Sequence, residues 1–358
     1  MTRSVKVRKQ LAKNARRRCR SVPAKARRKP CTKTAVRSKR ATDSKGQRPK
    51  VSRVSKGIQT VSERSELPIA PRKSGIQWTG KMWNTVAGCT PVSPACAFCY
   101  AGKRLAPRYQ GRAQKGGDPG SPYLDIYDSQ KKHFSGNVNL IRGSLGDPFE
   151  WNPDRPEAVF VNGQSDTFHE DVPDDWIVRM FNVMNLPCLR NYWFQILTKR
   201  SGRLCELGPS LLWAPNIWPG VTVENETYLH RVDDLINCGA PKVWLSIEPL
   251  LGPMNALELD ERIGWVVVGG ESGNGAKPDR QTHEEWVLDL RDRCADAGIP
   301  FFFKQWGCKA YNPLTEQGKI DPTTTGPRPT KGGCLLQGKI VREIPEQFRY
   351  LFPDLKAE

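Results

Sequence analysis

Seven short apolar runs, separated by polar stretches that can form helices, constrain the fold of this chain more than any other feature. The runs span residues 83–87, 158–162, 192–197, 217–223, 242–247, 265–268 and 300–304. Continuous apolar runs of this length are typical of parallel strands that are buried on both faces. From the second run onward they recur about every 25–35 residues, the interval that successive strand–helix units require. The pattern predicts an α/β protein with a parallel sheet.

Two of the intervening stretches carry helix signals. Residues 171–176 place acids and Pro173 where a first helical turn is expected, and residues 286–294 form a second helix that ends before Gly298 and Pro300. Six or seven such units over residues 75–310 predict a TIM-like partial (β/α) barrel. An open doubly wound sheet has the same periodicity and is the alternative. Residues 311–358 are predicted to form an irregular tail that packs across the barrel or covers one mouth.

The positive charge of the chain is concentrated near its beginning. Residues 1–60 hold 22 of the 56 basic residues and one of the 37 acids, Asp43, whereas the remainder carries 34 basic and 36 acidic side chains. With few apolar groups to bury, residues 1–72 cannot offset an ordering entropy of about 1–2 kcal/mol per residue, which predicts a disordered Lys/Arg-rich arm. Such an arm suits DNA or RNA, because it neutralises phosphates. A transit peptide and an extension from a mis-assigned start are the alternatives.

The eleven cysteines lack the spacing of a secreted disulfide scaffold and fit a reducing compartment. The sequence contains no apolar run long enough to span a membrane and no apolar segment of a secretory signal. These features predict a cytoplasmic protein without a membrane partner.

Three of the cysteines lie close together as Cys89, Cys96 and Cys99, a C-x6-C-x2-C pattern in a loop after the first strand. Three thiolates on one loop can converge on one metal centre, and Pro91 and Pro94 restrict the loop. A four-iron ([4Fe-4S]) cluster held by three cysteines keeps one iron open. In radical S-adenosylmethionine (SAM) enzymes that iron binds SAM, and an electron from the cluster cleaves SAM to a deoxyadenosyl radical.

Two other readings of these cysteines remain open. A structural zinc ion needs a fourth protein ligand, which a distant residue such as His133, His169 or Cys188 would supply. The three cysteines can also be buried thiols that bind no metal.

Several longer blocks of the sequence resemble an uncharacterised three-cysteine family of phages and bacteria that is regarded as radical-SAM-like. The blocks are residues 76–79, 83–84, 89–100, 159–162, 165–173, 194–200, 248–252, 267–273 and 302–307. The resemblance covers residues 75–310 but not the basic arm, and it implies an iron–sulfur enzyme that uses SAM. The first cysteine pair is spaced more widely than the usual radical SAM C-x3-C-x2-C, whereas the aromatic Phe98 before the last cysteine matches that pattern.

Polar residues follow most of the predicted strands, at the carboxyl ends where active sites of parallel barrels lie. The candidates for cofactor binding are Asp166, Lys199, Glu224, Asn225, Ser246, Gly269, Gly270 and Glu271, and the candidates for substrate contact or proton transfer are Glu248 and Lys304. Glu224 and Asn225 suit the ribose hydroxyls of SAM, which need acceptors. Asp166 suits its amino group and Lys199 its carboxylate.

Two glycines among these candidates have a different expected role. Gly269 and Gly270 would let the backbone approach the adenine or methionine part of SAM closely.

The sequence leaves three functions open. The first is a radical SAM enzyme that modifies or repairs nucleic acid, with an electron donor as a further partner. The second is a zinc-stabilised nucleic-acid-binding protein without catalysis. The third is a radical SAM enzyme that acts on a protein or small molecule, with no role for the arm.

Overall fold

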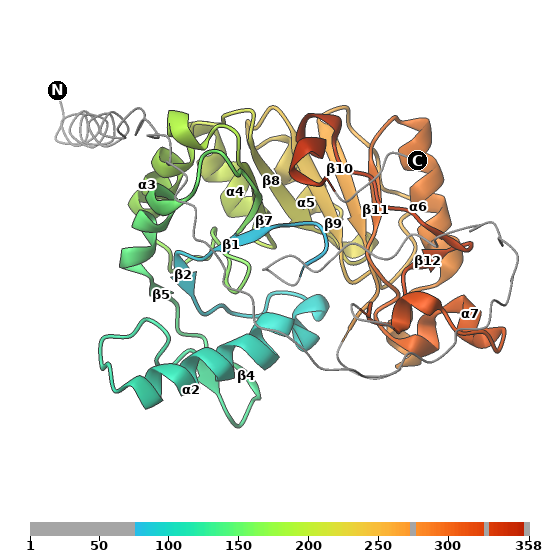
Figure 1. The fold of residues 1–358 in the computed structure, drawn as a ribbon, viewed down its shortest axis with the longest axis horizontal. Coiled ribbons are helices and arrows are strands. Elements are labelled where there is room, and N and C mark those ends of the chain that lie inside the picture. Colours follow the sequence, from blue (N-terminus) through green and yellow to red (C-terminus); the bar gives the residue numbers. More distant parts are fainter. Residues whose placement is uncertain (1–75, 273–276, 326–328, 354–358) are drawn as a thin grey trace, which may run out of the picture. The chain divides into compact units, whose positions relative to one another are not determined.

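A seven-stranded parallel sheet forms the centre of the chain (Figure 1). The computed structural model describes residues 76–272, 277–325 and 329–353, and the predicted basic arm lies outside these residues. The strands follow one another in chain order as β1 (Lys81–Trp83), β6 (Ala158–Val161), β7 (Trp193–Thr198), β8 (Ile217–Thr222), β9 (Val243–Ile247), β10 (Ile263–Val268) and β11 (Phe301–Phe303). Sequential order with parallel pairing throughout is the topology of a partial barrel, so the predicted α/β half-barrel is confirmed.

Four helices pack on the outer face of this sheet, namely α3 (Asp174–Met184), α4 (Ser201–Leu207), α5 (His230–Ile236) and α6 (Glu284–Asp296). The α3 helix begins as predicted, because Pro173 precedes it in extended conformation and Asp174 and Asp175 occupy its first turn. A further helix, α2 (Ala106–Gly116), lies at the carboxyl edge of the strands (Figure 1). No described helix is both long and apolar enough to cross a membrane.

The first predicted strand, residues 83–87, is wrong as a single strand. β1 ends at Trp83, and β2 (Val86–Ala87) pairs antiparallel with β5 (Asn139–Leu140) in a separate small sheet. The cause is the Asn162 side chain, whose Oδ1 accepts hydrogen bonds from the backbone N–H groups of Thr85 at 2.7 Å and Val86 at 3.2 Å. These N–H groups are therefore satisfied outside the parallel ladder, and the chain leaves the sheet there.

Tryptophans fill the amino end of the half-barrel interior. Trp193, Trp218, Trp244 and Trp265 lie near the beginnings of four adjacent strands and pack together on the inner face. Two glycines make room for them. A Cβ at Gly220 would lie 2.6 Å from the Trp244 ring, and a Cβ at Gly264 would lie 2.5 Å from the Trp218 ring. We call this group the indole layer.

The region predicted as an irregular tail contains the hairpin β12 (Leu335–Leu336) and β13 (Lys339–Ile340), the short α7 (Pro313–Glu316) and the 3-10 helix η10 (Glu346–Leu351). η10 covers the indole layer, because Phe348 stacks on Trp193 with ring centroids 4.3 Å apart. The red turn at the top of Figure 1 is η10, at the opposite end of the strands from α2. The amino end of the interior is thus filled, and the polar candidates lie at the other end.

Candidate functional site

The three cysteines lie on the loop between β2 and α2, at the carboxyl edge of the sheet. We call residues 88–100 the cysteine loop. It begins at Gly88, where φ is +90° and a Cβ would lie 2.0 Å from the Asn137 carbonyl oxygen, so that only glycine fits. Cys89, Cys96 and Cys99 are half-buried, and none forms a disulfide. All three thiols are therefore available as ligands.

Arg200, which follows the end of β7, fixes the beginning of the cysteine loop. Its guanidinium donates to the Thr90 carbonyl oxygen at 3.2 Å, to Thr90 Oγ1 at 2.6 Å and to Cys89 Sγ at 3.7 Å. Arg200 is in turn held by Asp166 at 3.2 Å and Glu170 at 2.6 Å. Burial opposes the charge of Arg200, but the two carboxylates raise its pKa overall, so this cation is permanent.

Two further side chains fix the middle of the cysteine loop. The His133 ring bonds through Nε2 to the Cys96 carbonyl oxygen at 2.9 Å, and burial lowers its pKa, which keeps the ring neutral at pH 7. Arg280 donates to the Pro94 carbonyl oxygen at 3.1 Å and is oriented by an ion pair with Glu271. Three separate parts of the chain therefore hold one loop at three backbone carbonyls.

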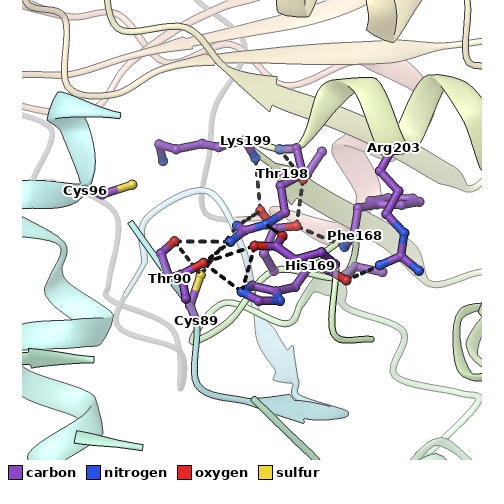
Figure 2. A network of polar contacts seen from close by, with 12 residues as sticks. Cys89, Thr90, Cys96, Phe168, His169, Thr198, Lys199 and Arg203 are labelled. Carbon is purple, nitrogen blue, oxygen red and sulfur yellow. Dashed lines mark hydrogen bonds and ion pairs between the residues drawn. The ribbon is translucent and has the colours of Figure 1, made fainter. Parts of the chain in front are cut away.

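Asp166 organises the outer side of this site, and two of the residues that donate to it, Thr198 and Lys199, are labelled in Figure 2. It accepts hydrogen bonds from Thr198 Oγ1 at 2.6 Å and from the Lys199 backbone N–H at 3.1 Å, in addition to its ion pair with Arg200. The sequence predicts Asp166 as an acceptor for the amino group of SAM. In the structure both of its carboxylate oxygens orient neighbouring residues and Arg200.

The surroundings of Cys89 disfavour its thiolate form. Burial, followed by the negative charge of Asp166, raises its pKa to about 12, while Arg200 lowers it and Cys99 and Cys96 raise it further. The thiol is therefore protonated near neutral pH until a metal replaces the proton.

The inner side of the carboxyl edge carries a second set of polar groups, which we call the inner polar row (Lys199, Thr222, Ser246, Glu248 and Lys304). Lys199 Nζ donates to Thr222 Oγ1 at 3.3 Å on the neighbouring strand. Lys304 Nζ forms an ion pair with Glu248 Oε1 at 2.9 Å, and Ser246 Oγ donates to Glu248 Oε2 at 3.4 Å. The structure thus brings four predicted site residues together, namely Lys199, Ser246, Glu248 and Lys304.

The predicted ribose acceptors are used differently. Glu224 is fully buried and forms an ion pair with Arg231 of α5 at 2.9 Å, and its Oε1 has no hydrogen-bond donor among the described residues. The Asn225 side chain caps the 3-10 helix η6 (Glu226–Tyr228) by accepting from the Thr227 N–H at 3.1 Å. Only the unpartnered Glu224 oxygen is left for another donor.

The predicted glycine pair has a packing role. A Cβ at Gly270 would lie 2.0 Å from the Trp306 carbonyl oxygen, so the glycine permits close approach of two backbones. A Cβ at Gly269 would lie 2.9 Å from Glu248 Oε1 and 3.4 Å from the Lys304 Cβ, beside the inner polar row. Glu271 is engaged by Arg280 and so orients the cysteine loop indirectly.

The described residues contain no group of three or more His, Cys, Asp or Glu side chains arranged to hold a metal ion. Figure 2 shows Cys96 apart from Cys89, on another element. A cluster therefore requires the cysteine loop to draw its sulfurs together. In number, kind and freedom from other covalent bonds, the three thiols fit a three-cysteine cluster.

A fourth ligand for zinc is harder to find. Both ring nitrogens of His169 are occupied, Nε2 by Thr90 Oγ1 at 2.8 Å and Nδ1 by the Asp171 N–H at 3.1 Å. His133 Nε2 is occupied by Cys96, but its buried Nδ1 has no hydrogen-bond partner among the described residues. Cys188 lies before β7, at the amino edge of the sheet. Of the three residues that the sequence offers as a fourth zinc ligand, His133 is therefore the one with a ring nitrogen left for a metal.

Of the three residues that hold the cysteine loop, the sequence does not select Arg200 and Arg280, and it offers His133 only as a possible zinc ligand. Arg200 directly follows Lys199, so the strand-end rule would find it if extended by one residue. Arg280 lies beyond the strand end and His133 lies in the short β4 (His133–Phe134), where no periodicity marks them. Their roles depend on contacts between distant segments.

Comparison with known proteins gives a family but no activity. No curated protein and no solved structure matches the chain. The model of a family described as "Protein of unknown function (DUF5131)" matches residues 73–345, which is most of the chain and includes the half-barrel and the cysteine loop. The protein therefore belongs to the DUF5131 family.

Proposed function

We propose that this protein is an iron–sulfur enzyme of the radical SAM class, with its cluster bound by Cys89, Cys96 and Cys99. The observation that carries the proposal is a loop with three free cysteines, fixed by Arg200, His133 and Arg280 at the carboxyl edge of a parallel half-barrel. A four-iron cluster with one open iron, when bound there with SAM, would supply one-electron cleavage of the SAM sulfonium bond.

The linked side chains of Arg200, Asp166 and Glu170 position the cysteine ligands. Arg200 directs an N–H group at Cys89 Sγ, and hydrogen bonds to ligand sulfurs tune the potential of a cluster. Asp166 and Glu170 fix the guanidinium, so this donor stays in place while the cysteine loop closes. The loop carbonyls of Thr90, Pro94 and Cys96 are already paired and need no water.

The inner polar row contains the groups that can contact a cofactor or substrate. No described carboxylate lies within ion-pair distance of the Lys199 ammonium, which leaves it available to the carboxylate of SAM. Glu248 and Lys304 neutralise each other and hold a proton donor and an acceptor side by side, which suits substrate contact or proton transfer. The unpartnered Glu224 Oε1 is the remaining acceptor on this side.

Anaerobic reconstitution with iron and sulfide tests the proposal. We expect about four iron atoms per chain, broad visible absorbance and a low-temperature spin signal that shifts when SAM is added. Cys96→Ala should abolish the absorbance and the spin signal. Cys205→Ala removes another half-buried free cysteine, on α4, and should leave both unchanged. Colourless protein that retains zinc would overturn the proposal in favour of a metal-stabilised binding protein.

A further inference from the structure

Cations from two segments of the chain surround the ring of Phe98 on the cysteine loop. Lys103 Nζ lies 4.2 Å from the ring centroid, Lys277 Nζ 4.9 Å and the Arg280 guanidinium carbon 5.1 Å. Contacts of this kind hold a cation over an aromatic face at a small gain for each pair. The cysteine loop is thus covered on one side by positive charge.

A second aromatic ring extends this surface. Tyr100 is 53% exposed, although it lies directly after Cys99, and Lys331 Nζ lies 5.3 Å from its ring centroid. Desolvation, followed by the positive charges of Lys304 and Arg104, lowers the pKa of Lys331. Lys304 and Arg104 are thus close enough to Lys331 to disfavour its charged form.

The positive charge here is local and largely unpaired. Within residues 76–272, 277–325 and 329–353, no carboxylate lies within 4.0 Å of Lys103, Arg104, Lys277 or Lys331. The chain after residue 60 is close to neutral, with 34 basic and 36 acidic residues, so general basicity does not explain the cluster. Like charges held together favour a bound polyanion, because its phosphates or carboxylates relieve the repulsion.

We propose that this surface, which we call the basic rim (Tyr100, Lys103, Arg104, Lys277 and Lys331), binds single-stranded nucleic acid. Cations alone would suit any polyanion, but an exposed aromatic ring among them is the arrangement on which bases stack while lysines contact the backbone. An acidic peptide would gain little from Tyr100. The basic rim therefore favours a nucleic acid over a peptide.

The position of the basic rim makes the nucleic acid the substrate. Tyr100, Lys103 and Arg104 directly follow Cys99 in the chain, and Lys304 of the inner polar row is an electrostatic neighbour of Lys331. A strand bound to the rim passes the mouth of the half-barrel. This assignment as substrate rests on the proposed function, whereas the binding itself does not.

Binding of a fluorescent mixed-sequence single-stranded 12-mer to the full chain tests the rim. We expect Lys103→Gln with Lys277→Gln to weaken binding roughly tenfold and to reduce the slope of log affinity against log salt by about 1.4, at about 0.7 per phosphate contact. Lys115→Gln with Lys339→Gln removes the same charge from two exposed lysines without ion pairs and should change neither beyond experimental error. Equal effects of the two pairs would overturn the proposal.

Tyr100 gives a second measurement that does not depend on net charge. Tyr100→Ala should weaken binding about fivefold to a hundredfold, and Tyr100→Phe should retain it, because stacking needs only the ring. A 12-mer with 4-thiouracil should cross-link on irradiation to residues 98–104. Cross-links confined to residues 1–60, or equal binding of polyglutamate, would overturn the rim assignment. Because no cluster or SAM is needed, these outcomes are independent of the iron test.

Discussion

Replacement of Arg200 by methionine is expected to lower the free energy of unfolding by about 3–5 kcal/mol. The Arg200 and Asp166 side chains are each 8% exposed and form an ion pair at 3.2 Å. Methionine fills much of the same volume but leaves the Asp166 carboxylate buried without its cation. The Thr90 carbonyl oxygen would lose its guanidinium donor at the same time.

Urea unfolding of the metal-free protein measures this loss. Arg179→Met is the matched control, because Arg179 pairs with Asp175 within the exposed face of α3, where such a pair contributes about 0.3–0.5 kcal/mol. Arg200→Met with Asp166→Asn should recover part of the stability, since no buried charge is then left alone. If Arg200→Met were no worse than Arg179→Met, Arg200 would not hold the cysteine loop.

Replacement of Arg231 by methionine is the second change with a large expected effect, again about 3–5 kcal/mol of unfolding free energy. Arg231 and Glu224 are 4% and 0% exposed in their side chains. Arg231 also donates to the Thr222 carbonyl oxygen at 2.7 Å, so its loss leaves two acceptors unpaired. Among the described residues, no donor reaches the Oε1 atom of the Glu224 carboxylate even in the wild type.

A double-mutant cycle separates a structural role of Glu224 from a ligand-binding role. Glu224→Gln with Arg231→Met should be much nearer the wild type in stability than Arg231→Met alone, because the buried charge is gone. Calorimetric titration of the reconstituted double variant with SAM gives the second readout. Affinity equal to that of the wild type would show that Glu224 serves only the fold, and weakened affinity would support its predicted contact with the ribose.

The fold could be predicted from the sequence because strands that are buried on both faces consist of nearly continuous apolar runs. All seven predicted runs contain a strand of the sheet or its end, and the largest error is at residues 83–87. There the pattern is apolar through Ala87, but the side chain of Asn162, more than seventy residues away, takes over the backbone N–H groups. The pattern of apolar residues within one segment does not predict a hydrogen bond to a side chain so far away in the sequence.

For the candidate site, the sequence predicts which edge of the sheet its residues share, but not their contacts. The rule that polar residues gather at the carboxyl ends of parallel strands places Lys199, Ser246, Glu248 and Lys304 together. This rule does not predict which carboxylates form ion pairs. Glu224, for example, pairs with Arg231 of α5, which packs against the sheet. Pairings are a property of tertiary contacts, whereas strand ends are a property of local sequence.

The indole layer determines that molecules cannot pass along the whole length of the half-barrel interior. Trp193, Trp218, Trp244 and Trp265 fill the amino end, and η10 packs over them, so the interior is closed at that end. A molecule that reaches the inner polar row therefore does not pass through the amino end of the half-barrel, and it enters and leaves without crossing the indole layer.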